Sequence, residues 1–245
     1  MGAMNQPFLI FLPHILGTLG AFVILGVGWR TPITTLLLYL PIYGLLFLVG
    51  IGCTPSRWLR AKATPVANSP LAPTTAIVLG FGYEGEGDAM RPGAANQFLV
   101  QWLLATQPQV TTLLVQEGIR SALTPTTLTE KAVQRIHRHD PAVYVDTLDT
   151  AFCALHQLQE LGQQNVLLVA HDLQLQRAVW DFTRVQQAAC AQCTIAIAAT
   201  PNTPYPTNSV HFQTRNEFIY KLVELLLLRP RDFLRATPTA CKAPM

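Results

Sequence analysis

The chain has 245 residues and a formal net charge of +3, and charged residues make up only 13% of it. Ordinary soluble domains contain about 25% charged residues, so the deficit indicates that part of the chain is buried in lipid. The small net charge, with no basic stripe interleaved with aromatic residues, gives no support to a nucleic-acid partner, and we expect none.

Two long apolar segments predict a transmembrane hairpin, with the lipid bilayer as its partner. Residues 8–29 and 33–53 contain no Lys, Arg, Asp or Glu, and each provides the roughly 20 residues that cross a bilayer core. A secretory signal peptide would have a basic start and a shorter apolar run, whereas residues 1–7 contain no basic side chain. We therefore expect residues 1–62 to form the hairpin and its exit from the membrane.

The side of the membrane that the remaining chain faces is predicted from its flanking charges. Arg57, Arg60 and Lys62 follow the second apolar segment, whereas the turn between the two segments carries only Arg30. Because positive charge accumulates on the cytoplasmic side, this distribution places both chain ends in the cytoplasm.

The rest of the chain predicts one α/β domain. Residues 63–73 are rich in Pro, Ala and Ser and indicate a linker. Apolar strand-like runs then alternate with helical patterns, which favours a Rossmann-like parallel sheet of about five strands with helices on both faces over residues 74–228. The expected strands are residues 75–79, 110–115, 142–145, 165–169 and 194–198. The expected helices are residues 94–106, 129–138, 149–161, 173–187 and 215–228, and residues 229–245 form an irregular tail.

The first expected strand runs into Gly80-Phe81-Gly82-Tyr83-Glu84-Gly85, which has the spacing of a dinucleotide-binding fingerprint. No helix begins within the motif, because Pro92 and Gly93 stand where one would start. Glu84, Glu86 and Asp88 would also repel a pyrophosphate. We interpret the motif either as a glycine-lined loop that approaches another ligand or as a surface turn.

The best-placed chemistry follows the fourth expected strand. His171 can move a proton near neutral pH, Asp172 can orient it, and Arg177 can bind a phosphate or carboxylate. The alternative is structural, with Asp172 capping the following helix and Arg177 pairing locally.

The remaining cysteines and histidines indicate neither a redox site nor a metal site. Cys190 and Cys193 form a C-x-x-C that precedes a strand rather than a helix, so we interpret them as a structural pair or as incidental. Cys153 lies within an expected helix and belongs to the core. His137 and His139 have no acidic neighbours that would complete a metal site.

Five segments in order resemble the YdcF/SanA/ElyC family: IVLGFG, LLVQEG, DTLDTAFCAL, NVLLVAHDLQLQRAVWDF and TRNEFIYKL. Carried over by position, Gly80 and Gly82 match the family's first glycine loop. Gln116, Glu117 and Gly118 stand at its Ser-Gly-Gly position.

Two further family motifs are matched only in part. Thr147, Asp149 and Thr150 stand at its S-x-N-T segment, and Tyr144 replaces an acidic residue before it. Arg177 matches the Arg of an H-x-x-R motif, whereas Gln174 stands at its His.

The resemblance implies a multi-pass protein of the bacterial plasma membrane acting in envelope biogenesis, in peptidoglycan or lipid-carrier metabolism. It also implies a domain outside the cytoplasmic membrane, opposite to the charge-based expectation, and S-adenosylmethionine as a candidate cofactor. We expect a small polar or anionic ligand at the carboxyl ends of the strands. The loss of the family His and acid leaves His171 as the proton-transfer group. The alternative is a non-catalytic scaffold that docks envelope-biosynthesis enzymes.

Overall fold

The computed structural model describes residues 44–45, 48–50, 73–85, 91–136, 146–189, 193–198, 200 and 202–228. The first predicted membrane segment, most of the second, and nearly all of the predicted linker lie outside these ranges, as do the tail and His137, His139, Tyr144 and Cys190. Gly44, Leu45 and residues 48–50 are helical. Within the ranges given, no helix is both long and apolar enough to span a bilayer.

One parallel sheet of five strands forms the centre of the domain, in the order β5-β4-β1-β6-β7. Its strands are β1 (Thr75–Val78), β4 (Thr112–Val115), β5 (Ala132–Arg135), β6 (Asn165–Val169) and β7 (Thr194–Ala198). Every neighbouring pair is parallel. The chain moves outward from β1 to β5 and then returns to the other side of β1, so the order reverses between β1 and β6. Ligand crevices of open parallel sheets form outside the carboxyl ends at such a reversal.

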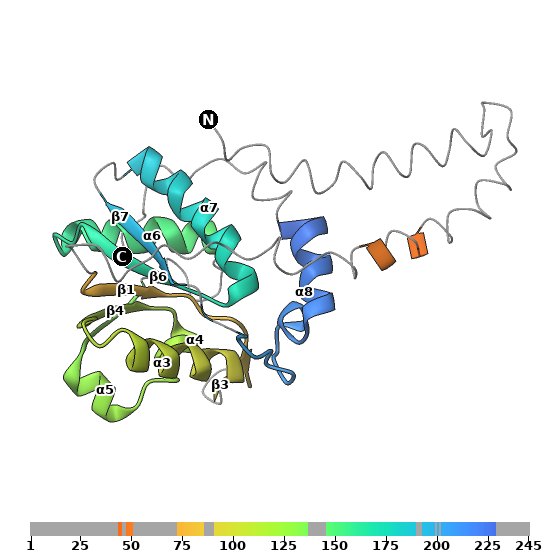
Figure 1. The fold of residues 1–245 in the computed structure, drawn as a ribbon, viewed down its shortest axis with the longest axis horizontal. Coiled ribbons are helices and arrows are strands. Elements are labelled where there is room, and N and C mark those ends of the chain that lie inside the picture. Colours follow the sequence, from red (N-terminus) through yellow and green to blue (C-terminus); the bar gives the residue numbers. More distant parts are fainter. Residues whose placement is uncertain are drawn as a thin grey trace, which may run out of the picture.

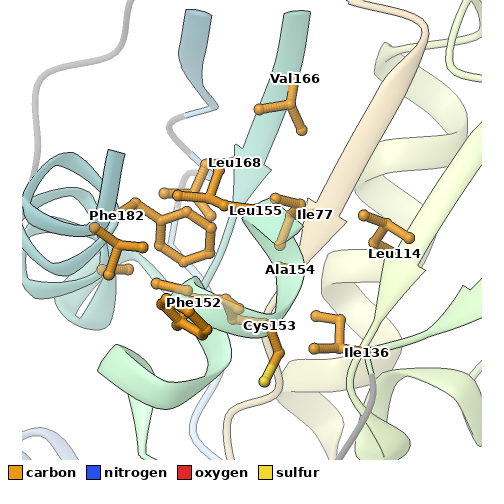
Figure 2. Close-up of a cluster of buried hydrophobic side chains, with 14 of the residues drawn as sticks. Ile77, Leu114, Ile136, Phe152, Cys153, Ala154, Leu155, Val166, Leu168 and Phe182 are labelled. Atoms are coloured by element: carbon orange, nitrogen blue, oxygen red, sulfur yellow. The ribbon is translucent and has the colours of Figure 1, made fainter. Parts of the chain in front are cut away.

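Helices cover both faces of the sheet, as the continuous apolar strands predict. On one face, α6 (Thr147–Glu160) and α7 (Asp172–Ala189) pack against side chains such as Ile77 and Leu168. On the other face, α3 (Ala94–Thr106) and α4 (Glu117–Arg120) pack against the alternate strand positions. Figure 2 shows Phe152 and Phe182 in the layer between the sheet and the first pair of helices.

The ends of α6 are fixed by local hydrogen bonds. The N-cap is Asp146, whose Oδ1 accepts from Asp149 N at 3.0 Å. The predicted start at Asp149 is therefore wrong by two residues, because the cap precedes Thr147. At the other end Gly162 adopts φ +64°, and Gly162 N and Gln163 N donate to the carbonyls of Gln159 and Leu158. These two hydrogen bonds together form the Schellman motif.

The predicted helix over residues 129–138 is wrong. A short helix, α5 (Pro125–Glu130), ends there, and residues 132–135 form β5 instead. The third strand was expected at residues 142–145, which lie outside the described ranges. Among the strands that the structure describes, β5 pairs only with β4, so it is an edge strand of the described sheet and has exposed positions. An edge strand tolerates the polar, helix-favouring residues Gln134 and Arg135 because one of its sides is not covered.

The last described segment closes one end of the sheet. The predicted helix 215–228 is resolved into α8 (Glu217–Val223) and a π-helical stretch, η4 (Glu224–Leu228), preceded by a 3-10 turn, η3 (Phe212–Thr214). Asn216 caps α8, its Oδ1 accepting from Ile219 N at 2.9 Å. Figure 1 shows α8 at the end of the sheet rather than over one of its faces. A small hairpin of β2 (Tyr83–Glu84) and β3 (Arg91–Pro92) follows β1.

Candidate functional site

The residues singled out in the sequence share one edge of the sheet. They follow the carboxyl ends of β1, β4 and β6 or lie at the start of α6, and they are Gly80, Gly82, Glu117, Gly118, Asp149, Thr150, His171, Asp172, Gln174 and Arg177. Within this edge they form two groups. One group surrounds the start of α6, the other lies at the start of α7, and the loop after β1 separates them.

The loop after β1 is held by side chains from the neighbouring elements. Gly80 N donates to Gln116 Oε1 at 2.7 Å, and Phe81 N donates to Asn96 Oδ1 at 2.8 Å. Asn96 Nδ2 in turn donates to the carbonyl of Gly82 at 2.6 Å. The backbone N–H groups of Gly80 and Phe81, which a phosphate would need as donors, therefore already have acceptors. No helix begins within the motif, as predicted, because Tyr83 and Glu84 form β2, the first strand of the hairpin.

Gly82 leaves room for the chain itself rather than for a ligand. Its φ is +70°, and a Cβ atom there would lie 2.4 Å from Thr214 Oγ1 and 2.6 Å from Ser209 Oγ. The glycine therefore permits the close approach of residues 202–228, which we call the C-terminal segment. Because this segment fills the space beside Gly82 and side chains occupy the nearby N–H groups, the loop does not fit S-adenosylmethionine.

The first group is a hydrogen-bonded chain that ends at the start of α6. Gln116 Nε2 donates to Thr150 Oγ1 at 2.8 Å, and Thr150 Oγ1 donates to the carbonyl of Asp146 at 2.8 Å. Beside it, Glu117 pairs with Arg135 at 2.7 Å, and both side chains are partly exposed. Gln116 thus connects the loop after β1 with the start of α6.

Gly118 contributes space to this group rather than a contact. A Cβ atom at Gly118 would lie 2.9 Å from Asn96 Nδ2. Since Asn96 is fully buried and holds the loop after β1, a larger residue at 118 would displace it.

The second group is centred on a buried pair, His171 and Asp172. His171 Nδ1 lies 3.0 Å from Asp172 Oδ1, and the histidine is fully buried. Leu173 N lies 2.9 Å from the same Oδ1 and 3.3 Å from the ring nitrogen. A carboxylate is the stronger acceptor, so the network assigns the Leu173 proton to Asp172 and a second proton to Nδ1. In this tautomer of a neutral ring, Nε2 is an acceptor and thus a general base.

Aromatic residues cover His171. Phe81 stacks on its ring with centroids 3.7 Å apart and planes at 19°. The rings of Tyr205 and Tyr220 lie 4.9 and 6.4 Å from the histidine ring. Phe81 comes from the loop after β1 and both tyrosines come from the C-terminal segment. The point where the strand order reverses is therefore filled by the chain's own side chains.

Arg177 lies in a buried ion pair rather than on the surface. Its Nε is 3.0 Å from Glu224 Oε2, and only 7% of Arg177 and none of Glu224 is exposed. Tyr220 Oη donates to the same Oε2 at 3.1 Å. Burial, followed by the charge of Glu224, raises the pKa of the Tyr220 hydroxyl well above its ordinary value. Arg177 thus bonds α7 to the C-terminal segment.

Gln174 lies one turn after His171 and is 9% exposed. Its Oε1 is buried and accepts no hydrogen bond from any part of the chain that the structure describes. Buried side-chain acceptors almost always have a hydrogen-bond donor, so we expect a donor from outside the described chain to bind this oxygen.

Several residues of the edge were not found from the sequence: Phe81, Asn96, Arg135, Tyr220 and Glu224. Gln116 was placed only by its position in the family resemblance. A single acid in the apolar run ELLLL is the signal that would have marked Glu224 as a buried partner. No comparable local signal marks Asn96 or Gln116, whose partners lie 15 and 36 residues away. Comparison with known proteins finds no matching family model, no matching curated protein and no matching solved structure.

Proposed function

We propose that this chain is a membrane-anchored protein of the bacterial cell envelope whose α/β domain binds a small polar ligand at the carboxyl edge of the sheet. The membrane anchor rests on the two uncharged segments of 22 and 21 residues, 8–29 and 33–53. Leu45, Leu48 and Val49, which belong to the second segment, are exposed apolar side chains in helical conformation. The role in envelope biogenesis rests on the resemblance to the YdcF/SanA/ElyC family.

The observation that carries ligand binding is the unsatisfied Gln174 Oε1 one turn from the His171–Asp172 pair. A buried acceptor without a donor costs about 1–3 kcal/mol. A ligand hydroxyl or amino group that donates to it would recover this energy. Nε2 of His171, three residues earlier in the chain, would accept a proton from the same class of group, so the His171–Asp172 pair supports general-base chemistry.

The charges of the edge favour a polar ligand over an anionic one. Glu117, Asp146, Asp149 and Asp172 lie at this edge, while the charge of Arg177 is neutralised by Glu224. Arg135 is paired with Glu117. An incoming phosphate would therefore meet net negative charge. Access to His171 requires the C-terminal segment to move, because Phe81, Tyr205 and Tyr220 cover the ring.

The full chain in nanodiscs, incubated with a bacterial metabolite extract and read by mass spectrometry, tests this proposal. We expect one metabolite enriched by the wild type and by His156→Gln, and not by His171→Gln. His156 is a matched control because it lies on α6 with half of its side chain exposed. The proposal fails if no metabolite is enriched, or if the enrichment is equal in both variants.

The anchor needs a test of its own. The full chain should remain in the membrane fraction after an alkaline carbonate wash, and its release would contradict the anchor. Labelling of a Ser69→Cys variant, in a chain without its native cysteines, by an impermeant thiol reagent in intact cells would place the domain outside. Labelling only after lysis would place it in the cytoplasm.

A non-catalytic scaffold is the second candidate. The close packing of His171 against Phe81 favours it, because a ring used only for packing needs no access. On this alternative, the chain binds an envelope enzyme and that interaction survives His171→Gln.

A further inference from the structure

The C-terminal segment packs on the edge of the sheet through a small apolar cluster of its own. The cluster joins Phe81, Ala95 and Leu173 to Tyr220 and Leu225 of the segment. It is separate from the two larger clusters that fill the layers on either face of the sheet. A satellite cluster of this kind is typical of a long segment that lies over a domain, rather than of one that builds its core.

The backbone of the C-terminal segment is joined to the rest of the described chain at one place. Val210 N donates to the carbonyl of Tyr83 at 2.9 Å, and no other backbone hydrogen bond links residues 202–228 to the described residues before them. The segment also adds no strand to the described sheet. Because so few backbone bonds would break, the segment can leave the edge while the sheet stays intact.

Much of what the segment buries is polar. Its polar or charged side chains that are almost completely buried are Thr203, Ser209, Thr214, Lys221 and Glu224. Water replaces the hydrogen bonds of such groups when they become exposed, so each contributes little net free energy to the closed arrangement. Polar contacts between two parts of one chain are accordingly the kind that permit relative motion.

Arg177, Glu224 and Tyr220 form the latch of this arrangement. Glu224 Oε2 accepts from Arg177 Nε at 3.0 Å and from Tyr220 Oη at 3.1 Å. Arg177 belongs to α7, whereas Glu224 and Tyr220 belong to the segment. Both charges regain their hydration when the latch opens, which offsets much of the attraction that is lost. The same latch holds the Tyr220 ring beside His171.

We propose that the C-terminal segment is a lid that opens as a unit and gates access to the His171–Asp172 pair, with Arg177, Glu224 and Tyr220 as its latch. The structure holds the closed state, in which Tyr205 and Tyr220 lie beside the histidine ring. Opening carries both tyrosines away and precedes the entry of a ligand. That a ligand binds beneath the lid rests on the proposed function, whereas the opening itself does not.

Pulsed thiol labelling of the full chain in nanodiscs, read by mass spectrometry of its peptides, tests the lid. Ala95→Cys places a thiol at a fully buried position of the small cluster. Pro206 of the lid lies close by, because a Cβ atom at Gly93 would be 2.7 Å from Pro206 Cβ. Native Cys153, buried in a larger cluster, reports the opening of the core in the same molecule. Every other cysteine is replaced by alanine.

We expect the thiol at position 95 to be labelled at least about tenfold faster than Cys153, because a lid opens at less cost than the core. Glu224→Gln should raise the rate at position 95 by a further factor of about ten or more and leave Cys153 unchanged, since the closed lid then buries an unpaired Arg177. Glu160→Gln is the matched control, because Glu160 pairs with His156 on the exposed side of α6. It should change neither rate. Tyr220→Phe is a milder second variant, which removes one hydrogen bond of the latch and keeps the ring.

Carbethoxylation of His171 by diethyl pyrocarbonate shows whether the lid gates the site. The rate at His171 should rise in Glu224→Gln together with the labelling rate at position 95, while the half-exposed His156 reacts equally in both chains. A His171 that stays unreactive while position 95 is labelled would overturn the proposal.

Equal labelling rates at position 95 and at Cys153 in the wild type and in both latch variants would also overturn it, because the segment would then unfold only with the core. Neither measurement contains a ligand, so both are independent of metabolite capture. A lid that opens in a chain that captures no metabolite would contradict the proposed function and leave the lid supported.

Discussion

Arg177 and Glu224 form an ion pair 3.0 Å long in which both side chains are almost completely withdrawn from water. The two residues are 47 positions apart in the chain. Their pairing attaches the C-terminal segment to the start of α7, and Tyr220 adds a second hydrogen bond to the same carboxylate oxygen. The position of the aromatic cover over His171 depends on this attachment.

Arg177→Ala should strongly destabilise the domain. Removing one partner leaves a buried, uncompensated carboxylate, and such changes cost about 3–5 kcal/mol. Chemical denaturation measures this loss, with Arg120→Ala, an exposed residue of α4, as the control expected to change little. The double variant Arg177→Met with Glu224→Leu should recover most of the loss, because it leaves no unpaired charge. A loss under about 1 kcal/mol for Arg177→Ala would contradict a structural ion pair.

The sequence alone left two roles open for Arg177, the binding of a phosphate or carboxylate and local pairing. The residue type and its place at the carboxyl edge were read correctly, but Glu224 was not recognised as its partner. Local patterns predict which edge a residue lies on, because parallel strands share that edge. They do not predict which distant side chain meets it there.

Stability should fall at alkaline pH because of Tyr220. Burial, then the charge of Glu224, raises the pKa of its hydroxyl in the folded state well above the ordinary 10.0. The folded state therefore holds the Tyr220 proton more tightly than the unfolded state. This contribution to the free energy of unfolding is complete below a pH of about 10, and above it is lost at about 1.4 kcal/mol per pH unit.

Tyr220→Phe should therefore make the free energy of unfolding fall less steeply above pH 10. At neutral pH it should cost about 1.5–3 kcal/mol, through the lost hydrogen bond to a charged group. Tyr83→Phe, on β2, controls for the removal of a phenol. Parallel stability curves for wild type and Tyr220→Phe between neutral and alkaline pH would count against a raised pKa.

Gly82→Ala and Gly162→Ala form a matched pair. Both glycines have positive φ, at +70° and +64°, so both alanines carry the left-handed penalty of about 1–2 kcal/mol. No described residue lies within 4 Å of a Cβ atom at Gly162, whereas a Cβ atom at Gly82 would overlap Thr214 and Ser209. Gly82→Ala should cost about 1–3 kcal/mol more, the range for overpacking. Equal losses in thermal or chemical denaturation would mean that the C-terminal segment does not pack on the loop.

Strands and helices with strong apolar patterns were predictable from the sequence. Residues 165–169 and 194–198 are strands as expected, and residues 94–106 form the expected helix. β5 was not predictable in the same way, because its sequence AVQR has neither a continuous apolar run nor a clear alternation. Its identity as a strand is fixed by pairing with β4, which is information from outside the segment.

The sequence predicted the edge of the sheet at which the candidate site lies. It did not predict the hydrogen bonds and ion pairs within the site. The placement of Gly80, Thr150 and His171 at one edge follows from the parallel sheet. The spacing of Gly80 and Gly82 suggested an approach to a ligand, but the space belongs to the C-terminal segment. The glycine at position 82 indicates that another group approaches the backbone closely. The sequence alone does not show whether that group belongs to a ligand or to the chain itself.

The last prediction concerns the proton on the His171 ring. Asp172 Oδ1 lies 3.0 Å from Nδ1 and 2.9 Å from Leu173 N, so the carboxylate holds the Nδ1–H tautomer. When Asp172→Ala removes it, Leu173 N, now 3.3 Å from Nδ1, has the ring nitrogen as its nearest acceptor. Nδ1 then accepts a hydrogen bond, and the ring proton moves to Nε2.

Long-range ¹⁵N–¹H correlation spectra of a chain labelled at histidine distinguish the two tautomers. We expect Nδ1–H in the wild type and Nε2–H in Asp172→Ala, while the resonances of the exposed His156 stay unchanged. The functional consequence is specific, because a ring protonated at Nε2 no longer offers that nitrogen as a base. Ligand capture or turnover that depends on His171 should therefore be lost in Asp172→Ala even where the domain remains folded. An Nε2–H tautomer in the wild type would instead show that Asp172 does not orient the ring.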